Sequence, residues 1–133
     1  MGDLLKFSIP GKPEYLGVVR LAISSIANCA AFDLDSIDDI KVAVSEACMN
    51  VVRHGTSSEL CYDIECRIEK DRFIILVSDC CGGFNIEKYS EPCLEDPKEN
   101  GMGIFIIRAL MDEVDIYSKV GEGTKIKMVK YIL

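Results

Sequence analysis

Residues 60–69, LCYDIECRIE, alternate apolar and polar side chains without a break. Neighbouring side chains of a β-strand point to opposite faces, so this pattern predicts a strand with one buried and one exposed face. Residues 73–79, FIILVSD, follow a short turn and are apolar on both faces, which predicts a central antiparallel strand. A sheet of this kind must bury its apolar face against another layer.

The chain offers helices for that layer. Three segments have helical apolar spacing: residues 12–32, 34–55 and 101–112. In the second segment we expect Ser36 to cap the helix, with Asp39 three residues further on. The same segment is apolar on several sides, which indicates that it is covered on several sides.

The remaining segments complete the sheet. A short strand is expected at residues 4–10, and residues 113–120 and 124–133 form a final hairpin. The sequence therefore predicts an α+β fold. We expect a two-layer sandwich with a mostly antiparallel mixed sheet and about three helices on one face, in a single domain spanning residues 1–133.

Composition narrows the function classes. The net charge of −7 argues against direct binding to a nucleic acid backbone, which requires clustered Lys and Arg. No apolar run is long enough to span a membrane and no signal peptide is evident, so we expect a cytoplasmic protein. The seven cysteines are odd in number and poorly spaced for zinc, so reduced cysteines are favoured over a disulfide framework or a zinc site.

Two polar residues interrupt the second helix. Glu46 and Asn50 are four positions apart and therefore share one stripe of an otherwise apolar helix. Taken alone, they could equally be a solvated stripe. Asp79 raises a similar question, because a carboxylate at the end of a central strand is costly to dehydrate unless a group donates to it. An ordinary turn after the strand is the alternative explanation.

Glycines open the third helix. The N-terminus of a helix attracts phosphate through its free N–H groups and dipole, so Gly101, Met102 and Gly103 are candidate phosphate contacts, although a simple loop-to-helix junction is commoner. The long loop of residues 80–100 is of the kind that often acts as a binding lid.

In combination these stretches resemble a known family. SEACMNVVRHG, VSDCCGGF, NGMGIFIIRALMDEV and GEGTKIKM, in this order, look like the four nucleotide-binding boxes of the GHKL, or histidine-kinase-like, ATPase superfamily. SEA-x-x-N-x-x-x-HG and GMGI…LMDEV are most similar to the bacterial anti-sigma-factor serine/threonine kinases. The resemblance covers nearly the whole chain.

The resemblance assigns roles to the candidate residues. It implies that Glu46 is the general base and that Asn50 coordinates the Mg²⁺ bound to ATP. It implies that Asp79 accepts a hydrogen bond from the adenine amino group. The other implied nucleotide contacts are His54, Gly83, Gly101, Met102, Gly103 and Thr124. For His54 a helix C-terminal dipole partner is the alternative.

The resemblance also implies partners. It indicates an ATP-dependent protein serine/threonine kinase that phosphorylates an anti-sigma antagonist protein, sequesters a sigma factor and forms a homodimer. Two positions depart from the family pattern. Cys81 replaces a glycine, and Glu99 and Asn100 stand where the kinases often carry a basic residue, so that either Lys98 just before them takes that role or turnover is weak. They support the alternative of a nucleotide-binding, protein-sequestering module with weak or no kinase activity.

Overall fold

The structure is a computed structural model that describes residues 2–54, 61–79, 99–119 and 123–132. The helices are α1 Leu16–Cys29, α2 Leu34–His54 and α3 Glu99–Leu110. A 3-10 turn at Pro13–Tyr15 directly precedes α1. The strands are β1 Asp3–Pro10, β2 Cys61–Ile68, β3 Arg72–Asp79, β4 Glu113–Lys119 and β5 Gly123–Tyr131.

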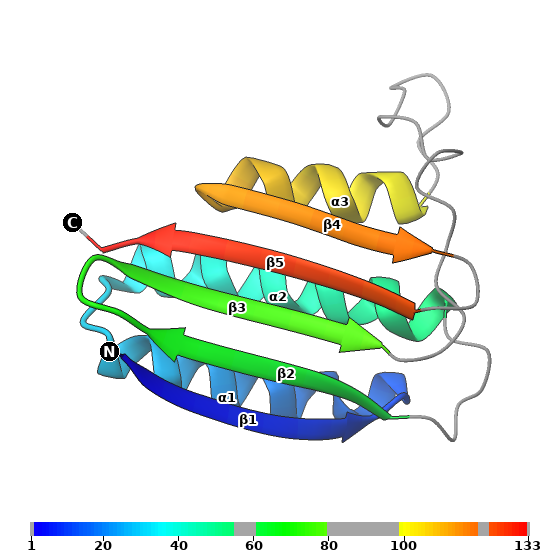
Figure 1. Cartoon of the computed structure of the whole chain (residues 1–133), viewed down its shortest axis with the longest axis horizontal. Coiled ribbons are helices and arrows are strands. Elements are labelled where there is room, and N and C mark those ends of the chain that lie inside the picture. Colours follow the sequence, from blue (N-terminus) through cyan, green and yellow to red (C-terminus); the bar gives the residue numbers. More distant parts are fainter. Residues whose placement is uncertain (1, 55–60, 80–98, 120–122, 133) are drawn as a thin grey trace.

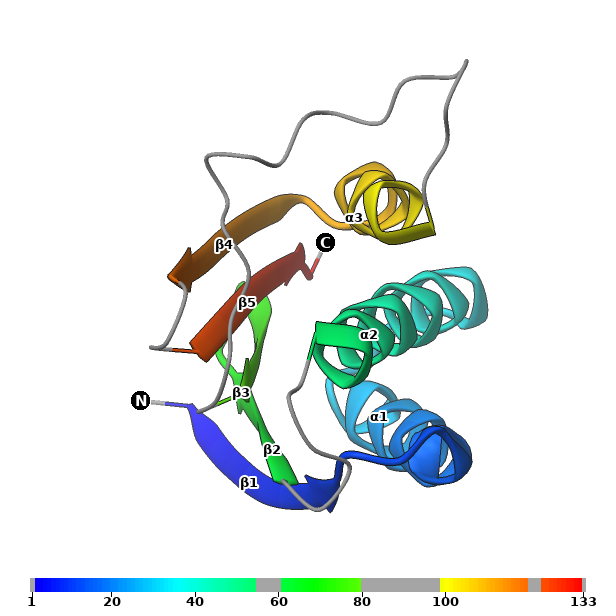
Figure 2. The same ribbon diagram turned by 90° about the vertical axis from the view of Figure 1, so that its right-hand side faces the viewer.

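The described strands form one sheet in the order β1-β2-β3-β5-β4. All three helices lie on the same face of this sheet, which Figure 2 shows edge-on. The predicted two-layer α+β sandwich is therefore confirmed. Every described strand pair is antiparallel, so the sheet is not mixed within this part of the chain. β5 returns between β3 and β4 and runs opposite to both.

The alternating pattern of β2 behaves as predicted. Tyr62, Ile64 and Cys66 are fully buried beneath the helices. β3 lies in the centre of the sheet, as its apolar sequence predicted, and buries Phe73 and Val77 on the same face. Burial of this face against the helices supplies the main favourable free energy of the fold.

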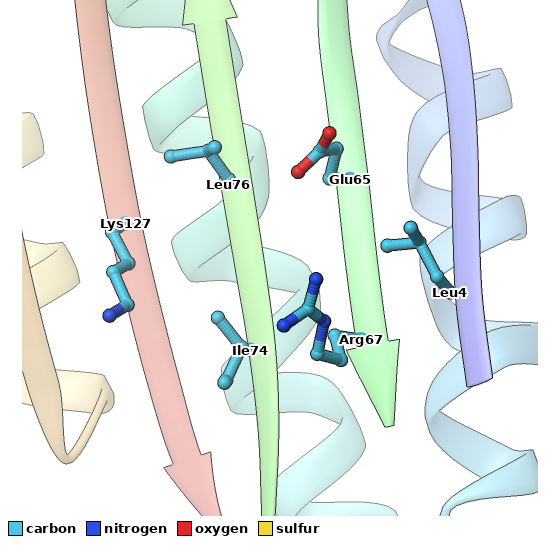
Figure 3. Close-up of a pocket in the computed structure, with 6 residues that line it drawn as sticks. All are labelled: Leu4, Glu65, Arg67, Ile74, Leu76 and Lys127. Atoms are coloured by element: carbon cyan, nitrogen blue, oxygen red, sulfur yellow. The ribbon is translucent and has the colours of Figure 1, made fainter. Parts of the chain in front are cut away.

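On the opposite face of the sheet, no helix of the described part of the chain covers the strands. Figure 3 shows this face, where apolar and charged side chains from β1, β2, β3 and β5 surround a shallow hollow of about 280 Å³. Its lining residues are Leu4, Glu65, Arg67, Ile74, Leu76 and Lys127. An ion pair joins Lys6 to Glu65 with an N–O distance of 2.9 Å. The exposed face of the sheet thus carries both apolar and charged side chains.

Helix α2 is capped differently from our expectation. The Ser36 backbone N–H donates to Asp33 Oδ1 at 2.8 Å, so Asp33, not Ser36, is the N-terminal cap. The prediction placed the cap inside the helix, because the helix begins at Leu34. Asp39 instead faces Lys130 with an N–O distance of 3.9 Å, and Lys130 Nζ also donates to the Leu110 carbonyl oxygen at 2.7 Å. Lys130 therefore links α2, α3 and β5.

Among the described residues, none of the helices combines the length and the apolar character needed to cross a bilayer.

We predict that Asp33→Ala lowers the urea midpoint of unfolding at pH 7, since the helix loses its cap. Hydrogen bonds from Ser36 hold the pKa of the Asp33 carboxyl below its ordinary value of 3.8. The carboxylate's stabilising effect is therefore complete above pH 3.8 and is lost as the pH falls through the lowered pKa. Urea titrations at pH 7 and pH 3 should show the gap to wild type narrowing in acid. Asp38→Ala, an exposed change in the same helix, is the control and should shift the midpoint less.

Candidate functional site

Several polar side chains gather at one end of the sandwich. The end of β3, the start of β5, the start of α3 and the last turns of α2 all lie at this end, on the right in Figure 1. Asp79 and Thr124 are direct partners in the β3–β5 ladder, and both are buried, with 5% and 1% of their surface exposed. The fold thus places side by side two residues that are 45 positions apart in the sequence (124 − 79).

Asn50 lies on the part of α2 that covers this end of the sheet. It is only 3% exposed, and its Nδ2 atom has no hydrogen-bond partner among the described residues. A buried amide without a partner is costly. The carboxamide can turn so that either its nitrogen or its oxygen takes the position that lacks a partner. Its oxygen is a ligand type that Mg²⁺ accepts, so this residue fits a magnesium-nucleotide.

Glu46 lies one turn earlier on α2, where α3 passes closely. A β-carbon built on Gly103 of α3 would lie 3.0 Å from Glu46 Oε2, so only glycine leaves this carboxylate undisturbed. Gly103 is the fifth residue of α3, because the helix begins at Glu99, two residues before the predicted start. Gly103, a predicted phosphate contact, thus also lies close to Glu46, the predicted base. The sequence did not reveal this proximity.

Glu46 also borders a groove between α1 and α2. The groove has a volume of about 410 Å³. Its lining residues are Arg20, Asp38, Lys41, Val42, Ser45, Glu46 and Met49. Arg20 Nε donates to Ser45 Oγ at 2.9 Å and so holds the two helices together beside the carboxylate. Glu46 is partly buried, and a group entering this groove can reach it.

Other predicted site residues are described less fully. His54 is the last residue of α2, and Gly101 and Met102 lie in the first turn of α3. The end of α2 and the first turn of α3 lie at the same end of the sandwich (Figure 1). Gly83, Cys81 and Lys98 lie outside the described residues, as does most of the predicted lid of residues 80–100, whose last two residues instead begin α3. The roles of all these residues stay predictions.

A buried cluster of two cysteines and a tyrosine lies beside the site. Cys48 and Cys66 are both fully buried, and loss of hydration raises the pKa of each thiol to about 12. Burial also raises the pKa of the Tyr62 phenol, which lies next to Cys48. The four described cysteines (29, 48, 61 and 66) form no disulfide with one another, and no metal-binding group of His, Cys, Asp and Glu occurs in the described ranges.

Proteins of similar sequence show the family of this chain. Residues 9–130 match the model of the histidine kinase-like ATPase domain. The chain belongs to the histidine kinase-like ATPase domain family. Two curated relatives are named serine-protein kinase RsbW. The one from Oceanobacillus iheyensis is 39% identical over 98% of this chain and 87% of its own length. The one from Halalkalibacterium halodurans is 35% identical over 98% of this chain and 84% of its own length. Within the family, the chain therefore belongs with the RsbW serine-protein kinases.

Solved structures support the fold. The crystal structure of the RsbU and RsbW domains of a Mycobacterium tuberculosis protein superposes with a TM-score of 0.73 at 19% identity. The match covers 96% of this chain and 31% of that one, so this chain spans about a third of that protein's length. At this identity the likeness concerns the fold alone.

We predict that Gly103→Ala shifts the Glu46 carboxylate by a few tenths of an ångström without destabilising the protein. The side chain of Glu46 is flexible at its end, and alanine is favoured over glycine in a helix by about 0.5–1 kcal/mol. A crystal structure and urea denaturation of the variant measure the two effects.

Gly17→Ala is the matched control, because nothing lies within 4 Å of a β-carbon at this position. It should leave Glu46 unmoved. An unchanged Glu46 position in Gly103→Ala would show that the close contact does not constrain the carboxylate.

Proposed function

We propose that this chain is an ATP-dependent serine-protein kinase that also acts as an anti-sigma factor. The observation that carries the proposal is the pairing of Glu46 with Asn50 on one stripe of α2, with Gly103 of α3 held against the Glu46 carboxylate. The stripe is covered at Asn50, which is buried, and is reached from the α1–α2 groove at Glu46, which is partly buried. Membership of the RsbW kinases supports the same conclusion.

The proposed chemistry begins with the acceptor serine. Its hydroxyl enters beside Glu46, whose carboxylate orients it and takes its proton. The serine oxygen then forms a bond to the γ-phosphorus as the bond between that phosphorus and the bridging oxygen of ADP breaks. Phosphoryl transfer depends chiefly on positioning and charge neutralisation. A base that α3 borders closely at Gly103 and that is open to the α1–α2 groove on the other side is suited to the reaction.

Asn50 would hold Mg²⁺ through its side-chain oxygen. When bound, the ion neutralises the negative charge of the triphosphate. Asn50 is one helical turn from Glu46, so α2 fixes the register between the metal ligand and the base. In the same proposal Gly101 and Met102 offer the free N–H groups of the first turn of α3 to phosphate. His54, Gly83 and Gly103 complete the proposed nucleotide contacts.

Adenine would be recognised at the end of β3. Asp79 accepts a hydrogen bond from the adenine amino group, and the Thr124 hydroxyl of the neighbouring strand completes the contact. Their direct pairing and their burial support this role, because a dehydrated carboxylate and a dehydrated hydroxyl form a selective site for a polar base edge.

The proposed partners follow the family. They are a sigma factor, which the protein sequesters, and an anti-sigma antagonist protein, which carries the acceptor serine. The protein would act as a homodimer in the cytoplasm without direct contact to nucleic acid. The net charge of −7 favours a basic partner surface.

A second candidate function is a nucleotide-dependent sequestering module with weak or no kinase activity. The acidic Glu99, which opens α3, favours it, because an acid beside a triphosphate is repelled. Phosphate transfer to a purified antagonist separates the two functions. Absence of transfer by a chain that binds ATP would favour the module.

We predict that Glu46→Gln leaves ATP binding intact but slows phosphate transfer by about 100- to 10,000-fold, the range expected for loss of a general base. Single-turnover assays with radiolabelled ATP and calorimetry measure the two quantities. Glu65→Gln, on the opposite face of the sheet, is the control and should transfer phosphate normally. Normal transfer by Glu46→Gln would refute the assigned base.

We predict that Asp79→Asn weakens ATP binding by about 1.5–3 kcal/mol, the value of a hydrogen bond to a charged group. Calorimetric titration with ATP measures the change. Asp115→Asn, at an exposed position of β4, should bind like wild type. An unaltered affinity in Asp79→Asn would rule out the proposed adenine contact.

A further inference from the structure

Tyr62 occupies an unexpected place beside the proposed adenine site. It is the second residue of β2 and the direct ladder partner of Asp79, which is itself the partner of Thr124. Tyr62, Asp79 and Thr124 therefore form a row of polar residues across three neighbouring strands, on the face that the helices cover. All three are buried, and Tyr62 is only 1% exposed. On its other side Tyr62 pairs with the apolar Ile9, so the polar row begins at Tyr62.

The Tyr62 hydroxyl meets the Cys48 thiol but no stronger hydrogen-bonding group of the described residues. Its oxygen is buried and has no nitrogen or oxygen partner among them. The Cys48 thiol lies beside it, but a thiol is a weak hydrogen-bonding group. Buried tyrosine hydroxyls usually have a partner, because leaving one unsatisfied is costly. Phenylalanine would fill the same space at no such cost, which points to a use for the oxygen.

Cys48 shows where this oxygen lies. On α2 it stands two residues after Glu46 and two before Asn50, and it is fully buried. Because Tyr62 is its neighbour, the hydroxyl lies in the layer between the sheet and the turn of α2 that carries the proposed catalytic groups. The site is polar on one side, through Asp79, and closed by α2 on the other.

We propose that the Tyr62 hydroxyl holds a buried water against the Asp79 carboxylate and so fixes the orientation of that carboxylate toward the amino group of a purine. A buried water needs two to four polar partners, and the row supplies the hydroxyl and the carboxylate. A carboxylate has about four acceptor positions, so Asp79 can bind both this water and the base. Tyr62 is thus a positioning residue for nucleotide selection. This inference rests on the proposed function, because it requires that Asp79 binds adenine.

Tyr62→Phe tests the inference, since it removes only the hydroxyl oxygen. Calorimetric titration should show ATP binding weakened by about three- to tenfold, the range for one water-mediated hydrogen bond. Binding of purine riboside triphosphate, which lacks the amino group, should change much less. Tyr117→Phe, at an exposed position of β4, is the matched control and should bind both nucleotides like wild type. In combination with Asp79→Asn the loss should be less than the product of the single losses.

Three outcomes would overturn the inference. Equal ATP affinity in wild type and Tyr62→Phe would make Tyr62 a packing residue. An equal loss for ATP and for the analogue would indicate a general effect on the core. A high-resolution crystal structure of the wild-type complex with an ATP analogue tests the inference even if the variant does not fold. The absence of a water between Tyr62 and Asp79 in that structure would also contradict the proposal. Failure of wild type to bind ATP at all would instead refute the proposed function, and the inference with it.

Discussion

The close approach of α3 to α2 is the contact on which the candidate site depends. At Gly103 the two helices come so near that the Glu46 carboxylate lies 3.0 Å from the position that a β-carbon of residue 103 would take. This contact joins the first turns of α3 to the polar stripe of α2, and so brings together chain segments that the sequence separates by more than 50 positions (103 − 46). In the proposed role of Glu46 as base, packing against α3 would limit the ordering that the carboxylate needs when a substrate arrives, which is the main advantage of a preorganised site.

The two ends of the sandwich have different tasks. At one end Lys130 links α2, α3 and β5 through Asp39 and the Leu110 carbonyl, and the cap at Asp33 begins α2 nearby. At the other end α2 and the sheet enclose buried polar groups, including Asn50, Asp79 and Thr124. Buried polar groups are costly. In this domain the buried polar groups lie at one end and the helices are anchored at the other. The polar groups lower the free energy of unfolding, and a ligand that binds to them would raise it again.

The sequence was a good guide to the elements and a partial guide to the site. The strict alternation of residues 60–69 predicted β2 and its two unlike faces, and the apolar run of residues 73–79 predicted a central strand. The cap of α2 was misplaced, because Ser36 and Asp33 are both good caps and only the backbone decides between them. Tyr62 was classed simply as an apolar-face residue, since alternation reports the face of a side chain and not what its polar atom meets.

By itself the sequence determined the period of each segment, the faces that must be buried and the spacing of Glu46 and Asn50 on one helical stripe, because these follow from local geometry. The tertiary structure alone decided that Asn50 on this stripe is buried, that Gly103 lies close to Glu46, and that Asp79 stands between Tyr62 and Thr124. Those facts depend on strand order and on how closely helices pack. Both arise from contacts between distant parts of the chain, which no local pattern encodes.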